Sequence, residues 1–196
     1  MILLTGFEPF DGDAENPSQL VVERLAGCVD ATAILPVSAA RTPVALRAAI
    51  ERHRPDVVLS LGLASERAHV SLERVAINVV DCVIADNDGV RLRDEPVLPG
   101  GPTAYFSTLP LRAILAAWEA EDVPGELSNS AGTFMCNQAL YWSLHLAAEF
   151  GHRAGFIHVP PASEAGLPLD AMERAVRIAL AAASTWRSGD APAPHL

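Results

Sequence analysis

The sequence contains little cysteine: only three, Cys28, Cys82 and Cys136, occur among 196 residues. No two form a C-x-x-C pair, and so sparse and odd a set suits neither a disulfide framework nor a zinc site. The six histidines show no H-x-x-x-H spacing either. We therefore expect no metal and no cofactor. Unpaired cysteines are typical of a reducing compartment, which favours the cytoplasm.

Basic residues are also few. Fourteen Lys and Arg stand against 24 Asp and Glu, which gives a formal net charge of −10. An acidic surface attracts neither nucleic acid nor an anionic membrane, so both are excluded as expected partners. Long apolar runs are missing as well. The first six residues form no basic region, and their apolar stretch is too short for a signal peptide or a membrane span. We expect a soluble, intracellular protein.

What is present is the composition of a compact globular protein, with 50% hydrophobic and 19% charged residues. A chain of this length fits one domain with a single sizeable core. It has no internal repeats. We expect a single domain over residues 1–187 and a frayed, Pro- and Ala-rich tail over residues 188–196.

Strands and helices alternate in the first third of the chain, which predicts an α/β protein with a largely parallel sheet covered on both faces. The middle differs, because residues 70–80 and 82–84 suggest antiparallel strands near an edge, followed by a turn-rich loop over 85–101. Strands are expected at 2–4, 31–37, 56–61, 125–128 and 154–159, and helices at 17–27, 43–53, 108–118, 136–150 and 169–187.

Cys136 stands where a strand and a turn of small residues lead into a helix. A thiol at a helix N-terminus feels the positive end of the helix dipole and the free backbone N–H groups, both of which favour the thiolate. The same N–H groups can stabilise an oxyanion formed when the sulfur attacks a carbonyl. The alternative is an ordinary buried cysteine.

Two further residues are candidates for chemistry. His158 lies near the end of an expected strand, where functional side chains gather in α/β sheets; the alternative is a core histidine bonded to backbone groups. Glu73 precedes Arg74 in an otherwise apolar run, so it is either a solvated ion pair or the acid that orients a histidine. His145 competes with His158, but about two helical turns separate it from Cys136.

Several segments, in the same order and across nearly the whole chain, resemble the pyroglutamyl peptidase I family, also called pyrrolidone carboxyl peptidases. The Cys and Glu segments are specific to that family, and the His segment is weaker alone. The matching segments are LTGFEPFDG (4–12), ERVAIN (73–78), DN (86–87), PGGPTAYFSTLP (99–110), SNSAGTFMCN (128–137) and GFIHVP (155–160).

The resemblance implies a cysteine peptidase that removes N-terminal pyroglutamate from peptides through a thioester. Cys136 would be the nucleophile, His158 the general base and then acid, and Glu73 the residue that orients His158. The implied fold is a three-layer α/β/α sandwich with a mixed, twisted sheet, which the family shares with purine nucleoside phosphorylases. Family members commonly form tetramers, so a homo-oligomer is expected.

Pyroglutamate is a flat, uncharged lactam, and its pocket needs an apolar slot with a donor and an acceptor but no carboxylate. In the family, two phenylalanines of the first loop flank the ring, which matches Phe7 and Phe10; plain core packing is the alternative for both. The expected substrate-binding residues are Phe7, Phe10, Asn16, Ile84, Phe134 and Met135.

The chain departs from the family at three positions. Val83 stands where many members have an arginine close to the oxyanion, Leu63 where glutamine is common, and Ser65 at a usually Gly, Ala or Pro position. Losing one oxyanion donor costs about 10²-fold in rate or more. Arg67 and Arg91 are the replacements that the sequence offers.

These departures motivate a rival function, a weakly active or non-catalytic binder of pyroglutamyl peptides. A phosphorylase or nucleoside hydrolase on the same sandwich is a third reading, but it needs a phosphate site, and no cluster of Arg or Gly-loop donors stands out.

Overall fold

A computed structural model of the chain describes residues 1–163 and 167–186. The expected tail over 188–196 and the predicted helix end at residue 187 lie outside these ranges. Within them, six strands form one mixed sheet in the order β2-β1-β3-β8-β4-β7, in which the β4–β8 pair is antiparallel and the other neighbours are parallel. The strands are β1 (Ile2–Phe7), β2 (Ala31–Leu35), β3 (Val57–Leu63), β4 (Val70–Glu73), β7 (Gly125–Ser128) and β8 (Arg153–Val159).

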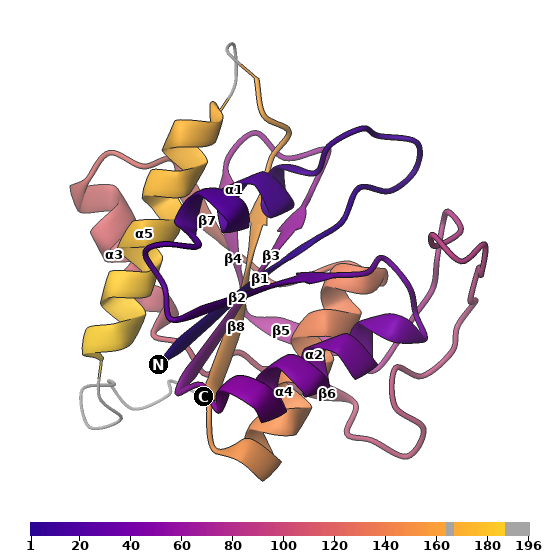
Figure 1. The fold of residues 1–196 in the computed structure, drawn as a ribbon. Coiled ribbons are helices and arrows are strands. Elements are labelled where there is room, and N and C mark those ends of the chain that lie inside the picture. The colour runs from indigo at the N-terminus through magenta and orange to yellow at the C-terminus, as the bar shows by residue number, and fades with distance from the viewer. Residues whose placement is uncertain (164–166, 187–196) are drawn as a thin grey trace.

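Helices cover both faces of the sheet, which confirms the α/β class and the three-layer sandwich (Figure 1). On one face lie α1 (Pro17–Leu25), α3 (Leu111–Ala120) and α5 (Leu169–Thr185), whose apolar residues share one core. On the other lie α2 (Arg41–His53) and α4 (Met135–Phe150), which share a second core. None of the described helices is long and apolar enough to cross a membrane.

The alternation of side chains along each strand decides which of them meet α4. Ile157 and Val159 of β8 belong to the core beneath α1, α3 and α5, so His158 between them points to the opposite face. Leu72 of β4 belongs to that same core, and Glu73 beside it therefore points away as well. The strand pattern thus puts His158 and Glu73 on the face where α4 begins.

The middle of the chain is the part that the sequence predicted least well. The strand expected over 70–80 breaks at Arg74 into β4 and a short β5 (Val75–Ile77). β5 pairs antiparallel with β6 (Ala104–Phe106), an unpredicted strand, in a separate two-stranded sheet. The antiparallel pairing expected here is confirmed for β4 with β8 and for β5 with β6.

The strand predicted at residues 82–84 is wrong. Cys82 is buried and its N–H donates to Leu92 O, while Arg91 Nε donates to Cys82 O. These bonds fix one point of an irregular segment without building a ladder, and Val83 beside them is exposed. The apolar pattern of this segment therefore reflects a single buried side chain, that of Cys82, on a loop.

Candidate active site

α4 begins directly after Phe134, whose backbone is extended and whose side chain makes no capping hydrogen bond to the described residues. Cys136 is the second residue of the helix. The first N–H groups of a helix have no acceptor within it, so Cys136 sits among free backbone donors. The thiol therefore has the helix N-terminal position that the sequence predicts.

A turn of small residues carries the chain from β7 to this helix. The Ser130 N–H donates to Ser128 Oγ over 3.2 Å, and the Gly132 N–H donates to Ser130 Oγ over 3.2 Å. Gly132 has a φ of 75°, a left-handed conformation that glycine adopts without strain. The predicted strand, turn and helix are all present.

Gly62, near the carboxyl end of β3, leaves room for the sulfur of Cys136. A Cβ atom on Gly62 would lie 2.6 Å from Cys136 Sγ and 2.7 Å from the ring of Phe156. Both distances are too short for real contacts. The close approach of β3 to the thiol thus requires glycine at this position.

His158 and Glu73 form a buried pair. His158 Nδ1 lies 2.8 Å from Glu73 Oε1, and both side chains are almost fully inaccessible to solvent. Because an ionised carboxylate only accepts, the ring must donate its Nδ1–H, which leaves Nε2 as the basic nitrogen. His158 lines the same cavity as Cys136, so Nε2 is the nitrogen available to the thiol and to a ligand.

Arg67, from the loop between β3 and β4, completes this network. Its Nη1 donates to Glu73 Oε1 over 2.7 Å, and its Nη2 donates to Ser128 Oγ and Ser130 O, each over 3.1 Å. From the sequence, the alternative to an orienting role for Glu73 was a solvated ion pair with Arg74. Arg67 was considered only as a replacement for the arginine expected near the oxyanion. The Arg67–Glu73 pair was missed because it closes across a loop that gives no periodic signal.

Burial shifts both candidate reacting groups toward their neutral forms. It raises the pKa of the Cys136 thiol to about 12, and the negative charge of Glu73 adds to the rise, while Arg67 and the backbone oppose it. Burial lowers the pKa of His158 despite the opposing pull of Glu73. Both shifts therefore favour a neutral thiol and a neutral imidazole, because desolvation disfavours the charged form of each group.

These groups open onto a cavity of about 220 Å³ whose other walls are mainly apolar. The Phe10 and Phe134 rings lie 6.1 Å apart at 44°. Five of the six expected substrate-binding residues line the cavity; Ile84 is half-buried and is not among the lining residues. The lining residues are Phe7, Phe10, Asn16, Val37, Leu63, Ala64, Arg67, Ala131, Gly132, Phe134, Met135, Cys136 and His158.

Asn16 contributes mainly by holding the first loop. Its Nδ2 donates to Glu8 O over 3.0 Å, and its Oδ1 accepts from the N–H of Ser18 over 3.0 Å and from its hydroxyl over 2.8 Å. Asn16 is thereby the N-cap of α1. These bonds fix the loop that follows Phe7, the last residue of β1, and carries Phe10. The sequence placed both phenylalanines in the loop.

Comparison with known proteins gives this arrangement a family. The model of the pyroglutamyl peptidase family matches residues 1–185. The chain belongs to that family. It is 46% identical over 175 residues to the pyrrolidone-carboxylate peptidase of Clavibacter michiganensis, covering 86% of this chain and 82% of that protein. It is also 46% identical over 197 residues to that of Streptomyces coelicolor, covering 93% of this chain and 91% of the relative.

Solved structures agree with the family. Pyrrolidone carboxyl peptidase from Pyrococcus furiosus superposes with a TM-score of 0.89 at 37% identity, covering 93% of this chain and 97% of that one. The fold expected from the family resemblance is therefore confirmed for the described residues.

Of the positions expected to depart from the family, one lines the cavity and another does not. Val83 is 76% exposed and does not line it, whereas Leu63 does. Of the two replacement arginines, Arg91 is exposed and bonded to Cys82 O, while Arg67 lines the cavity. Arg67 thus keeps a cation at the cavity, with its hydrogen bonds directed to Glu73, Ser128 and Ser130.

Proposed function

We propose that this chain is a cysteine peptidase that removes N-terminal pyroglutamate from peptides, with Cys136 as nucleophile, His158 as general base and acid, and Glu73 as the residue that orients His158. The observation that carries the proposal is the 2.8 Å bond between His158 Nδ1 and Glu73 Oε1 at a cavity that also contains Cys136. Nucleophile, base and orienting acid are the three parts that thiol acyl transfer requires.

The cavity suits an uncharged five-membered lactam. No Asp or Glu side chain is among its described lining residues, so it has nothing to compensate the ammonium of an ordinary N-terminus. Its aromatic walls, Phe10 and Phe134, offer flat apolar faces to a small ring. The blocked N-terminus is therefore what the cavity selects.

Attack begins with both groups neutral. The proton of the Cys136 thiol passes to Nε2 of His158 as the sulfur bonds to the carbonyl carbon that joins pyroglutamate to the next residue. The carbonyl oxygen gains the negative charge, and the free N–H groups at the start of α4 stabilise it. Glu73 supports the imidazolium through its bond to Nδ1.

The intermediate then collapses. His158 gives its Nε2 proton to the leaving nitrogen, the C–N bond breaks, and the shortened peptide departs with a free amine. The remaining thioester is attacked by a water molecule whose proton goes to Nε2. The C–S bond breaks, pyroglutamic acid leaves, and the proton returns to the sulfur.

The test is release of a fluorophore from a pyroglutamyl amide by the wild type, Cys136→Ala, Cys136→Ser and the control Cys28→Ser, whose thiol is exposed outside the cavity. We expect turnover by the wild type and the control only, slow inactivation by iodoacetamide, and no release from the corresponding prolyl amide. A wild type that binds pyroglutamate, seen as a raised melting temperature, yet releases no fluorophore is a binding protein, and the peptidase proposal fails.

We further propose a cytoplasmic homotetramer. Support comes from the family resemblance, the unpaired cysteines, and the β5–β6 pair, on which Phe106 is 73% and Ile77 37% exposed. Exposed apolar side chains on a strand pair favour burial against another copy. Light scattering after size exclusion tests this, and a monomeric mass that persists at micromolar concentration contradicts it.

A further inference from the structure

The geometry points to Arg67 as a positioning residue that ties the Glu73–His158 pair to the turn leading to Cys136, so that one guanidinium sets both halves of the reacting pair. This inference rests on the proposed function, because it concerns how the same site is held together.

The guanidinium spans the ends of two neighbouring strands. Glu73 and Ser128 are the last residues of β4 and β7 and are direct partners in the parallel register of these strands. Arg67 donates to both of these side chains and also to the backbone oxygen of Ser130, in the turn that follows β7. A planar group with several donors can serve three acceptors at once, which a single ammonium cannot do with the same geometry.

Arg67 also supplies the charge that the buried carboxylate requires. Glu73 is fully buried, and its Oε2 has no hydrogen-bond partner among the described residues, so His158 and Arg67 both donate to Oε1. A buried carboxylate without a cation is strongly destabilised. Without Arg67, Glu73 is compensated either by a protonated His158 or by taking up a proton itself. A protonated imidazole cannot accept the thiol proton, and a neutral Glu73 gives the imidazolium no support.

Within residues 1–163 and 167–186, the charged and titratable groups around His158 are few. They are Glu73 on β4, which favours the imidazolium, Arg67 on the preceding loop, which opposes it, and Cys136 on α4, which lines the same cavity. Arg67 thus helps to keep the base unprotonated while Glu73 keeps it oriented.

The second half of the role concerns the nucleophile. Ser128 Oγ donates to Ser130 O over 3.1 Å, so Arg67 contacts both ends of a closed turn. Ala131 and Gly132, which follow, line the cavity, and α4 begins three residues later. Releasing this turn lets the start of α4 move relative to His158, and a displacement of 1 Å can cost about 10²-fold in rate.

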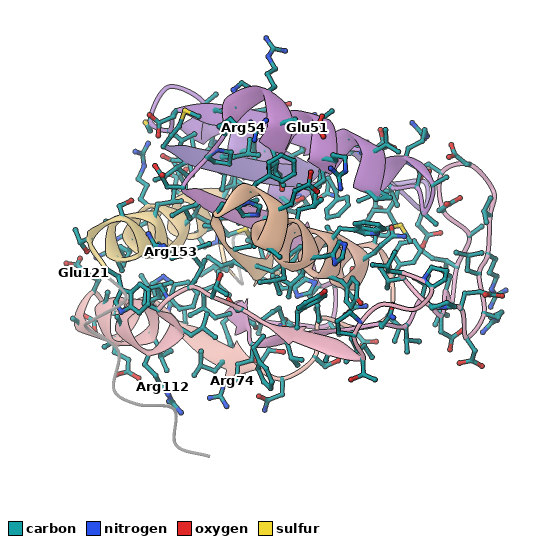
Figure 2. All side chains as sticks on the ribbon, turned by 90° about the horizontal axis from the view of Figure 1, so that it is seen from below. Glu51, Arg54, Arg74, Arg112, Glu121 and Arg153 are labelled. Atoms are coloured by element: carbon teal, nitrogen blue, oxygen red, sulfur yellow. The ribbon has the colours of Figure 1, made fainter. Side chains whose placement is uncertain are left out.

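The experiment compares wild type, Arg67→Gln, Arg67→Lys and Arg74→Gln. Arg74 is the matched control because it is the next arginine along the chain and its side chain lies at the outer edge of the molecule (Figure 2). For each variant, kcat and KM for a pyroglutamyl amide are measured from pH 4.5 to pH 9, with the melting temperature as a check on folding.

For Arg67→Gln we expect a fall of about 10²-fold in kcat, a KM within threefold of wild type, and an acid limb of kcat/KM moved to higher pH by about one unit. Arg67→Lys should return the acid limb to its wild-type position while kcat stays at least fivefold low. Arg74→Gln should match the wild type.

Three results overturn the inference. Arg67→Gln could keep the wild-type kcat and the wild-type acid limb, or it could change KM alone. The third is a kcat of Arg67→Lys equal to that of the wild type. If Arg67→Gln does not fold, the kcat and acid limb of Arg67→Lys decide alone. Absence of turnover in the wild type contradicts the proposed peptidase instead, so the two failures are distinguishable.

Discussion

His158 Nδ1 and Glu73 Oε1 meet at 2.8 Å although 85 residues separate them in the chain. Their strands, β8 and β4, form the antiparallel pair of the main sheet, and the pair faces the start of α4. The antiparallel pairing thus places the Glu73 carboxylate against Nδ1 of His158. Because Nδ1 keeps its proton in this bond, Nε2 is the nitrogen that can act as a base.

Glu73→Gln isolates the contribution of charge at this pair. Glutamine keeps an oxygen where Oε1 accepts from His158 and Arg67, and its amide group can occupy the place of Oε2, so the geometry is retained. Losing the support for the imidazolium should lower kcat by about 10²- to 10⁴-fold with little change in KM. Glu126→Gln, at a half-exposed carboxylate on β7, is the control. A Glu73→Gln enzyme within threefold of wild type contradicts the orienting role.

Phe7, at the end of β1, and Phe10, in the loop after it, should respond differently to substitution. Phe7 is 2% exposed and belongs to the core beneath α2 and α4, so Phe7→Ala should lower the free energy of unfolding by about 3–5 kcal/mol. Phe10 is only partly buried and faces Phe134, so Phe10→Ala should raise KM roughly tenfold, about 1.4 kcal/mol, at a smaller stability cost. Denaturant titration and steady-state kinetics separate the two effects. Equal stability losses in the two variants, with an unchanged KM in Phe10→Ala, contradict the proposal that Phe10 and Phe134 form a slot for the lactam ring.

The pH profile follows from the two shifted groups. The His158 pKa lies below its usual value, so the base is lost only as pH falls through a point below about 6.5. The Cys136 pKa is raised to about 12, so no alkaline limb from the thiol is expected up to pH 9. We expect kcat/KM to be flat from pH 7 to pH 9 and to fall on the acid side. A rise that tracks thiol ionisation near pH 8 to 9 points instead to a thiolate nucleophile.

Val83→Arg introduces the residue that the family resemblance leads us to expect at this position. Val83 is 76% exposed, so the longer side chain has room and should leave the melting temperature unchanged. If the oxyanion lacks one donor, kcat should rise by up to about tenfold. Val90→Arg, at another exposed valine of the same irregular segment, controls for added charge. An unchanged kcat in Val83→Arg means that the donors already present carry the oxyanion.

The regular elements were predictable because their signals are local. Continuous apolar runs mark the buried strands β1, β3 and β8, and caps such as Asn16 with Pro17 mark α1. The 70–106 region was not, since β5 and β6 are three residues each and pair across a long irregular segment. Strands that short carry too few residues for an alternation to be distinguished from an anchored loop.

The residues of the candidate site also divide into those that the sequence indicated and those that it did not. Cys136 stands out from its turn and helix, but neither His158 nor Glu73 is distinctive alone; the family resemblance joined them. Arg67 had no such signal, because its partners lie on two strands and a turn that meet only in the folded chain. The raised pKa of the Cys136 thiol could not be predicted from the sequence either, since desolvation depends on which groups pack around the sulfur.

The half-buried Cys136 thiol, whose raised pKa favours its uncharged form, has a consequence for how long the protein keeps its activity in air. Peroxide and other oxidants react with thiolates far faster than with thiols, and the raised pKa of Cys136 favours the thiol at neutral pH. In the proposed mechanism, its reactive form arises only while His158 takes the proton in the presence of a carbonyl. An idle enzyme should therefore resist oxidative loss of activity without added reductant, and exposed Cys28 should be oxidised before it.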